Sequence, residues 1–226
     1  MGPFVQPGMT RKCPVRHFPS DSTRKPGAAI WRTIMRTIKL IGLCGSLRQQ
    51  SSNAVVLHTL SAELLPQDVS LSIFDLSEVP LYNADLDDDG PPKRVAELRE
   101  AVRQADGVVI ASPEYNHSMS GVIKNALDWV SSVDRPSPLK DKPTLTITAS
   151  PTLTGGSRAQ HQLSEVLWAA RAYLISFPQV VLTEIGSKIR NERLVDEAAR
   201  ATLCEAVEAL RKAAAETVHN NSLIWA

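Results

Sequence analysis

Polar side chains with the chemistry of a phosphate site gather in one short stretch, GSLRQQSSN, at residues 45–53. The candidate ligands there are Ser46, Arg48, Ser51, Ser52 and Asn53. Hydroxyl, amide and guanidinium groups donate hydrogen bonds to phosphate oxygens, and helix N-terminal amides attract the same charge. The alternative is an ordinary helix start capped by Ser51 or Ser52, and Arg48 favours the phosphate. Without a Gly-Lys-Ser/Thr or GxGxxG pattern, the stretch predicts neither a P-loop nor a standard dinucleotide site.

A second candidate stretch, PEYNHS at residues 113–118, combines flat side chains with polar ones. Pro113 and Tyr115 offer surfaces for a planar heterocycle, and the amides near Asn116 can bind its polar edge. The stretch follows the most apolar segment of the chain, GVVIAS. It therefore predicts a ring-binding loop beside the phosphate loop.

Two residues of this second stretch have competing interpretations. His117 has the chemistry of a general base, but a histidine between Asn and Ser is more often a solvated turn residue. Glu114 is a candidate helix cap or a partner for Arg48. The chain has no GxSxG motif, so a serine hydrolase is disfavoured.

A third stretch, SPTLTGGSR at residues 150–158, contains two adjacent glycines. Gly155 and Gly156 permit left-handed backbone and a close approach to a ligand, together with Ser150. The alternative is a simple turn before a helix. The place of this stretch after a strand favours binding.

The elements that must position these stretches alternate along the chain. Strands are predicted at residues 37–43, 69–74, 107–112, 143–149 and 179–182. Helices are predicted after residue 51, at 92–104, across 123–130, through 163–168 and at the C-terminus, where Leu194, Ala198, Leu203, Val207 and Leu210 would share or lie near one face. This alternation predicts an α/β fold, a three-layer, doubly wound domain with a five-stranded parallel sheet. Ligands of such sheets bind at the carboxyl ends of the strands, where all three polar stretches lie.

Charge and composition divide the chain in two. Of 25 Lys and Arg residues and 24 acidic residues, residues 1–36 hold seven and one, so residues 37–226 carry a formal net charge of −5. The basic, proline-rich segment 1–36 predicts a disordered leader, a tag, a transit-like peptide or an early start codon, and Met35 favours the last. The mildly acidic domain at 37–226 predicts no nucleic-acid partner.

No apolar run approaches the roughly 18 residues of a membrane span. The cysteines are Cys13, Cys44 and Cys204. Their odd number and spacing suit neither a disulfide framework nor a metal site, and they predict a cytoplasmic protein without a bound metal.

Three motifs together carry a family resemblance: GSLRQQSSN, SPEYNHSMSGVIKNALDWVS and GGSRAQ. With this spacing, residues 37–215 resemble the NADPH-dependent FMN reductase family, and within it the quinone/chromate reductase branch of the flavodoxin-like proteins. The resemblance implies bound FMN, NADPH or NADH as co-substrate, and small-molecule electron acceptors such as quinones, flavins or chromate. It also implies a homodimer or homotetramer, for which Trp129 is interface material or, equally, an interior residue.

The resemblance also implies roles for individual residues. The FMN phosphate would be held by Ser46, Arg48, Ser51, Ser52 and Asn53. The ring and ribityl chain would be lined by Pro113, Glu114, Tyr115 and Asn116, and closed by Ser150, Gly155 and Gly156. Tyr82, in the family-like segment PLYNADLD, and Arg158 would lie near the acceptor or nicotinamide. The third loop departs from the family, since PTLT replaces a glycine-rich stretch.

The implied reaction is ping-pong hydride transfer at the flavin N5, which requires no catalytic acid or base from the protein. One alternative is a flavodoxin-type electron carrier that does not oxidise NAD(P)H. The modest charge of −5 and Arg48 argue against it. The other is a flavin-free binding module, which would leave three donor-rich loops without a common ligand.

Overall fold

The computed structural model describes residues 36–132 and 137–224. Its strands are β1 (Ile38–Cys44), β2 (Val69–Phe74), β3 (Gly107–Ser112), β6 (Pro143–Ala149), β7 (Tyr173–Leu174) and β8 (Val180–Leu182). They form one parallel sheet in the order β2-β1-β3-β6, with β7 and β8 both paired to β6. The predicted doubly wound parallel sheet is confirmed. The predicted leader lies outside the described residues except for Arg36, which pairs with the Asp106 carboxylate.

The fifth position of the sheet is divided between two short strands. β7 pairs with the first two residues of β6, and β8 pairs with the last three. Between them, the buried Gln160 side chain enters from a helix and donates to the carbonyl oxygens of Thr146 (3.1 Å) and Val180 (2.9 Å). This amide replaces the missing strand pairing, and no local sequence pattern announces it.

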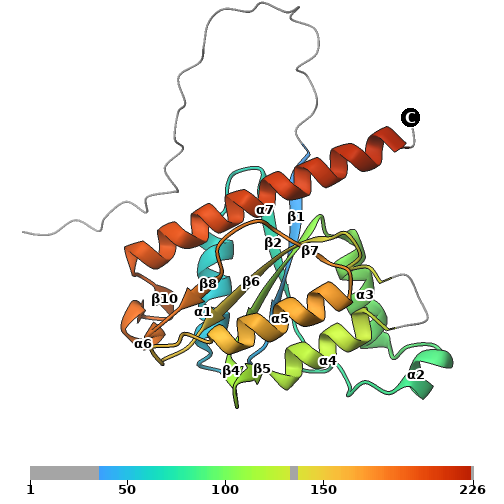
Figure 1. Ribbon diagram of the computed structural model, residues 1–226, viewed down its shortest axis with the longest axis horizontal. Coiled ribbons are helices and arrows are strands. Elements are labelled where there is room, and N and C mark those ends of the chain that lie inside the picture. The colour runs from blue at the N-terminus through green and yellow to red at the C-terminus, as the bar shows by residue number, and fades with distance from the viewer. Residues whose placement is uncertain (1–35, 133–136, 225–226) are drawn as a thin grey trace, which may run out of the picture.

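Helices cover both faces of the sheet (Figure 1). The helices α1 (Ser52–Thr59) and α7 (Glu197–Ile224) pack on one face, and α3 (Lys93–Gln104), α4 (Gly121–Val130) and α5 (Ser157–Ala169) pack on the other. Successive residues of β3 enter different cores: Val109 faces the α1–α7 side and Val108 the α3–α5 side. Because helices cover both faces, β3 and β6 are buried along their whole length.

Several small elements are additions to the predicted fold. They are η1 (Leu60–Leu64), α2 (Ala84–Asp88), β4 (Glu114–Tyr115), β5 (Ser118–Met119), α6 (Ile185–Lys188), β9 (Ile189–Arg190) and β10 (Arg193–Leu194). The expectation for Leu194 is wrong, because this residue lies on β10 and not on the C-terminal helix. Its amide donates to Thr59 Oγ1 at 3.1 Å, and Asp196 then caps α7 by accepting from the Ala199 amide at 2.9 Å. Leu194 is nevertheless fully buried in the core beneath that helix.

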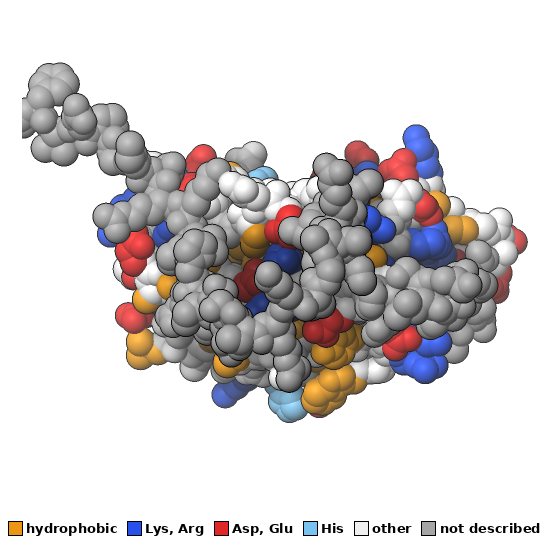
Figure 2. All heavy atoms as spheres, turned by 90° about the horizontal axis from the view of Figure 1, so that it is seen from above, with side chains coloured by type: hydrophobic (Ala, Val, Ile, Leu, Met, Phe, Trp, Pro, Cys, Tyr) orange, Lys and Arg blue, Asp and Glu red, His pale blue; other side chains and the backbone are white. Residues whose placement is uncertain are grey.

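Charged side chains fasten the outer elements. Glu63 on η1 accepts from Arg193 and Arg200, and Arg211 on α7 pairs with Asp68 at 3.0 Å. Seen from the α7 side, acidic and basic side chains lie next to one another on the described surface (Figure 2). The first turn and the middle of α7 are thus held by paired charges to η1 and to the segment before β2.

Candidate active site

Three loops meet at one edge of the sheet because β1, β3 and β6 are parallel neighbours. They follow the carboxyl ends of these strands, beside β4 and β5 at the lower edge in Figure 1. The amide of Gly45, the first residue of the first loop, donates to Ala111 O of β3 at 2.8 Å. The structure therefore brings the three polar stretches together, as the topology predicts.

The first loop contains both free and occupied polar groups. Arg48 is exposed and Ser46 and Ser52 are half-buried, whereas Ser51 and Asn53 are buried. Ser51 is the N-cap of α1, as one interpretation predicts, and its hydroxyl accepts from the Ala54 amide at 3.1 Å.

Asn53 spans from α1 to the end of β6. Its side-chain amide donates to Ala149 O at 3.1 Å, and its oxygen accepts from Ala149 N at 3.2 Å. This pair of bonds fixes the start of α1 against the third loop's strand. Within the described residues, the side chains of the first loop that remain open to an anion include Ser46, Arg48 and Ser52, together with the first amides of α1.

Cys44 lies directly beneath this loop. Its thiol donates to Ser46 O at 3.6 Å, and burial raises the pKa of the thiol despite hydrogen bonds to Ser46 and Ser51. The neutral thiol therefore supports the loop as a small packed side chain, since a thiolate is what nucleophilic chemistry requires.

The second loop is a β-hairpin. Asn116 and His117 form its turn with φ values of 49° and 66°, the left-handed geometry of a tight two-residue hairpin. Pro113 is buried at its base, and Tyr115 projects from it with 51% of its surface exposed. His117 is an exposed turn residue, as the preferred interpretation predicts.

Among the described contacts, Glu114 bonds neither to Arg48 nor to α4, the helix that follows its hairpin. Its carboxylate accepts from the amides of Arg158 (3.0 Å) and Ala159 (3.3 Å), in the first turn of α5. The Arg158 guanidinium in turn contacts His117 Nδ1. The sequence indicates Glu114 as a candidate cap, but it does not indicate this helix, which begins 43 residues later.

The two glycines of the third loop pack against protein. A Cβ on Gly155, at φ 60°, would lie 2.5 Å from Val181 Cγ1, and one on Gly156, at φ 94°, would lie 2.9 Å from Thr148 Cβ. Ser150 is buried and its hydroxyl lies 3.0 Å from Thr152 Oγ1. Thr148 Oγ1 is buried without a hydrogen-bond partner within the described chain. The glycines thus allow the loop to lie flat on β6 and β8.

Tyr82 packs against α4. Its amide donates to Asn125 Oδ1 at 2.7 Å, and its ring meets the Trp129 ring edge-on with centroids 4.9 Å apart. Trp129 is fully buried and its indole donates to Pro80 O at 2.7 Å, so the interior interpretation of this residue is correct.

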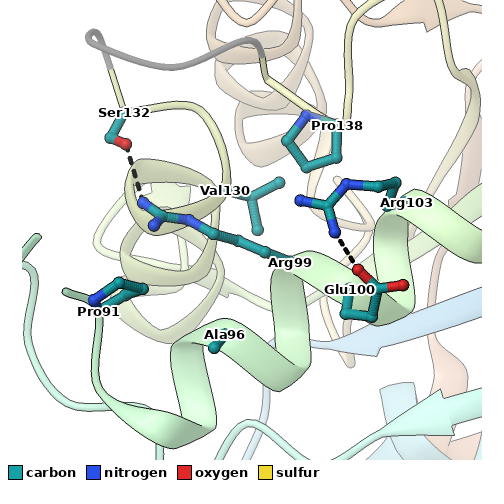
Figure 3. A pocket seen from close by; sticks show the side chains of 8 residues that line it. All are labelled: Pro91, Ala96, Arg99, Glu100, Arg103, Val130, Ser132 and Pro138. Carbon is teal, nitrogen blue, oxygen red and sulfur yellow. Dashed lines mark hydrogen bonds and ion pairs between the residues drawn. The ribbon is translucent and has the colours of Figure 1, made fainter.

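A cavity of about 380 Å³ lies elsewhere, between α3 and the end of α4 (Figure 3). Arg99 and Arg103 border it, but Arg99 is paired with Asp87 at 2.7 Å and Arg103 with Glu100. Both arginines that border this cavity are therefore already paired with carboxylates of the protein. In the part of the chain described, no cluster of His, Cys, Asp and Glu side chains could hold a metal, and no helix is long and apolar enough to cross a membrane.

Comparison with known proteins defines the class to which this site belongs. The profile of the NADPH-dependent FMN reductase family matches residues 38–186. The chain belongs to this family, and it is therefore an NAD(P)H-dependent oxidoreductase that uses FMN. The predicted family, enzyme class and cofactors are confirmed.

Individual relatives agree. An NAD(P)H-dependent FMN reductase of Pseudomonas aeruginosa is 37% identical over 177 residues, which cover 77% of this chain and 94% of that protein. A quinone reductase of Escherichia coli is 38% identical over 67% of this chain and 81% of its own. The solved structure of FerB, a flavoenzyme NAD(P)H:(acceptor) oxidoreductase from Paracoccus denitrificans, has a TM-score of 0.70 and 27% identity, and the match covers 79% of this chain and 98% of that one.

Proposed function

We propose that this enzyme reduces quinones, free flavins or metal oxyanions such as chromate with electrons from NADPH or NADH. The observation that carries the proposal is the juxtaposition, at one sheet edge, of the Arg48 loop and α1 N-terminus with the exposed Tyr115 hairpin. A ligand with both a phosphate and a flat ring matches this edge. The open, exposed rim sets no narrow shape for the acceptor, and the relatives named as quinone reductases support a quinone-like one.

The residues present fit FMN. Ser46, Arg48 and Ser52 would hold the phosphate at the start of α1, while Ser51 and Asn53 keep that helix end in place. Pro113, Glu114, Tyr115 and Asn116 would line the ring side. When bound, FMN supplies the redox chemistry by accepting a hydride and passing electrons on.

The third loop and the rim complete the proposed site. Ser150, Gly155 and Gly156 would close the flavin's other edge with backbone groups. Arg158, exposed beside the hairpin, would contact the nicotinamide co-substrate or the acceptor. Tyr82, which packs against α4, would contribute at the acceptor side.

An absorption spectrum tests the function first. The purified protein is expected to be yellow, to bleach anaerobically with NADPH and to recover its colour with a quinone. A yellow protein that ignores both nicotinamides would establish the electron carrier instead. A colourless protein that takes up no FMN would refute the proposal.

The phosphate loop has its own test. Arg48→Ala is expected to raise the Kd of FMN by roughly 10- to 100-fold, because a charged hydrogen bond contributes about 1.5–3 kcal/mol. Riboflavin, which lacks the phosphate, should bind the variant as it binds the wild type. An equal loss for both ligands would place Arg48 outside the phosphate site.

We further propose that the chain assembles as a homodimer or homotetramer and acts in the cytoplasm. Leu81, Tyr82 and Leu86 are exposed together on the segment that covers α4, and Leu81 has 83% of its surface free. Leu81→Glu is expected to lower the sedimentation mass, whereas Val195→Glu, at another exposed apolar side chain, should not. Equal masses for both variants would place the interface elsewhere.

A further inference from the structure

The N-terminus of α5 is capped by a side chain from a different loop. The residue before the helix is Gly156, which has no side chain to cap it. Glu114 from the hairpin takes this place, with its carboxylate 3.0 Å from Arg158 N and 3.3 Å from Ala159 N. Only 14% of the Glu114 side chain is exposed. A carboxylate at this position is stabilised both by hydrogen bonds and by the helix dipole.

This contact joins the second loop to the third. The β4–β5 hairpin lies beside the first turn of α5 (Figure 1). A second contact closes the link, because the Arg158 side chain returns to His117, whose Nδ1 lies 3.6 Å from Glu114 Oε1. Gly155 and Gly156 immediately precede the capped helix, so their path depends on where that helix begins.

The Glu114 contact also makes the N-termini of α5 and α1 differ in what they can bind. Glu114 occupies the α5 end with a carboxylate of the protein. At α1, Ser51 satisfies the amide of Ala54 through its hydroxyl, which leaves the preceding amides near Arg48 for a ligand. A phosphate would therefore bind at α1, and α5 would contribute only the shape of the third loop.

We propose that Glu114 is a positioning residue for the flavin ring: its carboxylate holds the third loop in the conformation that closes the ring's edge. This inference rests on the proposed function. In this role the length of the Glu114 side chain matters, because it must extend from the hairpin to the α5 amides. Its charge is not required to act on the flavin. Substitution separates side-chain length from charge, since glutamine keeps the length of glutamate and aspartate keeps its charge.

The test compares Glu114→Gln and Glu114→Asp, with Glu165→Asp on the exposed face of the same helix as the control. Dissociation constants for FMN and for riboflavin are measured on apoprotein by quenching of flavin fluorescence. Glu114→Asp is expected to raise both constants about fivefold, the equivalent of losing a helix cap of about 1 kcal/mol. Glu114→Gln should raise them less than Glu114→Asp does, because the glutamine oxygen still accepts from the α5 amides. The control Glu165→Asp should stay within about twofold of the wild type.

The outcomes separate the inference from the function beneath it. Wild-type affinity in Glu114→Asp would overturn the positioning role, and so would a loss in Glu114→Gln alone, which would show that the charge acts. A loss confined to FMN would overturn it as well, because the effect would then concern the phosphate. A wild-type protein that binds neither flavin would refute the proposed function, and this inference with it.

Discussion

Gly45, at the start of the first loop, packs tightly against the start of α4, and Gly45→Ala tests that contact. A Cβ there would lie 2.6 Å from Ser120 Oγ and 2.7 Å from Ile123 Cγ1. The backbone of Gly45 is not left-handed, so the conflict is one of space and not of backbone strain. Ser120 is also the N-cap of α4, with its hydroxyl 3.3 Å from Ile123 N.

The magnitude follows from these two contacts. Overpacking a tight interior costs about 1–3 kcal/mol, and a displaced serine cap costs about 1 kcal/mol more. Together they predict a loss of about 2–4 kcal/mol in the free energy of unfolding. For a domain of this size, that corresponds to a fall of roughly 5–15 °C in Tm.

Urea unfolding of the apoprotein measures this loss, with Gly121→Ala as the matched control. A Cβ on Gly121 meets nothing within 4 Å, and this residue begins α4, so alanine should stabilise the helix by up to about 1 kcal/mol. The two glycine-to-alanine changes should therefore shift the urea midpoint in opposite directions. If Gly45→Ala unfolds at the wild-type midpoint, the packing of the first loop on the start of α4 is not as described.

Two further predictions concern buried and paired side chains. Asn53→Asp is expected to lower the free energy of unfolding at pH 7 by about 3 kcal/mol, because it replaces the donor to Ala149 O by a buried carboxylate. Urea unfolding measures this loss, and unchanged stability would show that the Asn53 side chain does not join α1 to β6. Hydrogen bonds, chiefly from Arg193 and also from Arg200, lower the pKa of Glu63 from its ordinary value of 4.5. The ionised Glu63 therefore stabilises the fold fully above pH 4.5, and this contribution is lost as the pH falls through the pKa of Glu63 in the folded protein. Glu63→Gln should therefore cost about 1 kcal/mol at pH 7 and progressively less as the pH falls below 4.5, and a pH-independent difference would show that charge is not involved.

The sequence predicted the main elements well, because they depend on long local patterns. The predicted strands 69–74, 107–112 and 143–149 coincide with β2, β3 and β6. Each is an apolar run between turn signals, and burial on both faces favours such runs. The small hairpins escaped prediction because two-residue strands have no measurable period, and the turn at Asn116 lacks the Asn-Gly signal.

The sequence does not distinguish two kinds of role that the polar residues of the three loops have. Asn53 and Glu114 direct their side chains to backbone groups of neighbouring elements, whereas Arg48 and Tyr115 leave theirs exposed at the rim. In sequence both kinds are polar or aromatic side chains on adjacent positions of the same motif, so a motif match assigns all of them to the ligand. Only the tertiary contacts show which groups the protein has already used. Substituting the first kind should therefore change stability and affinity for every flavin together, while substituting Arg48 should change the response to the phosphate alone.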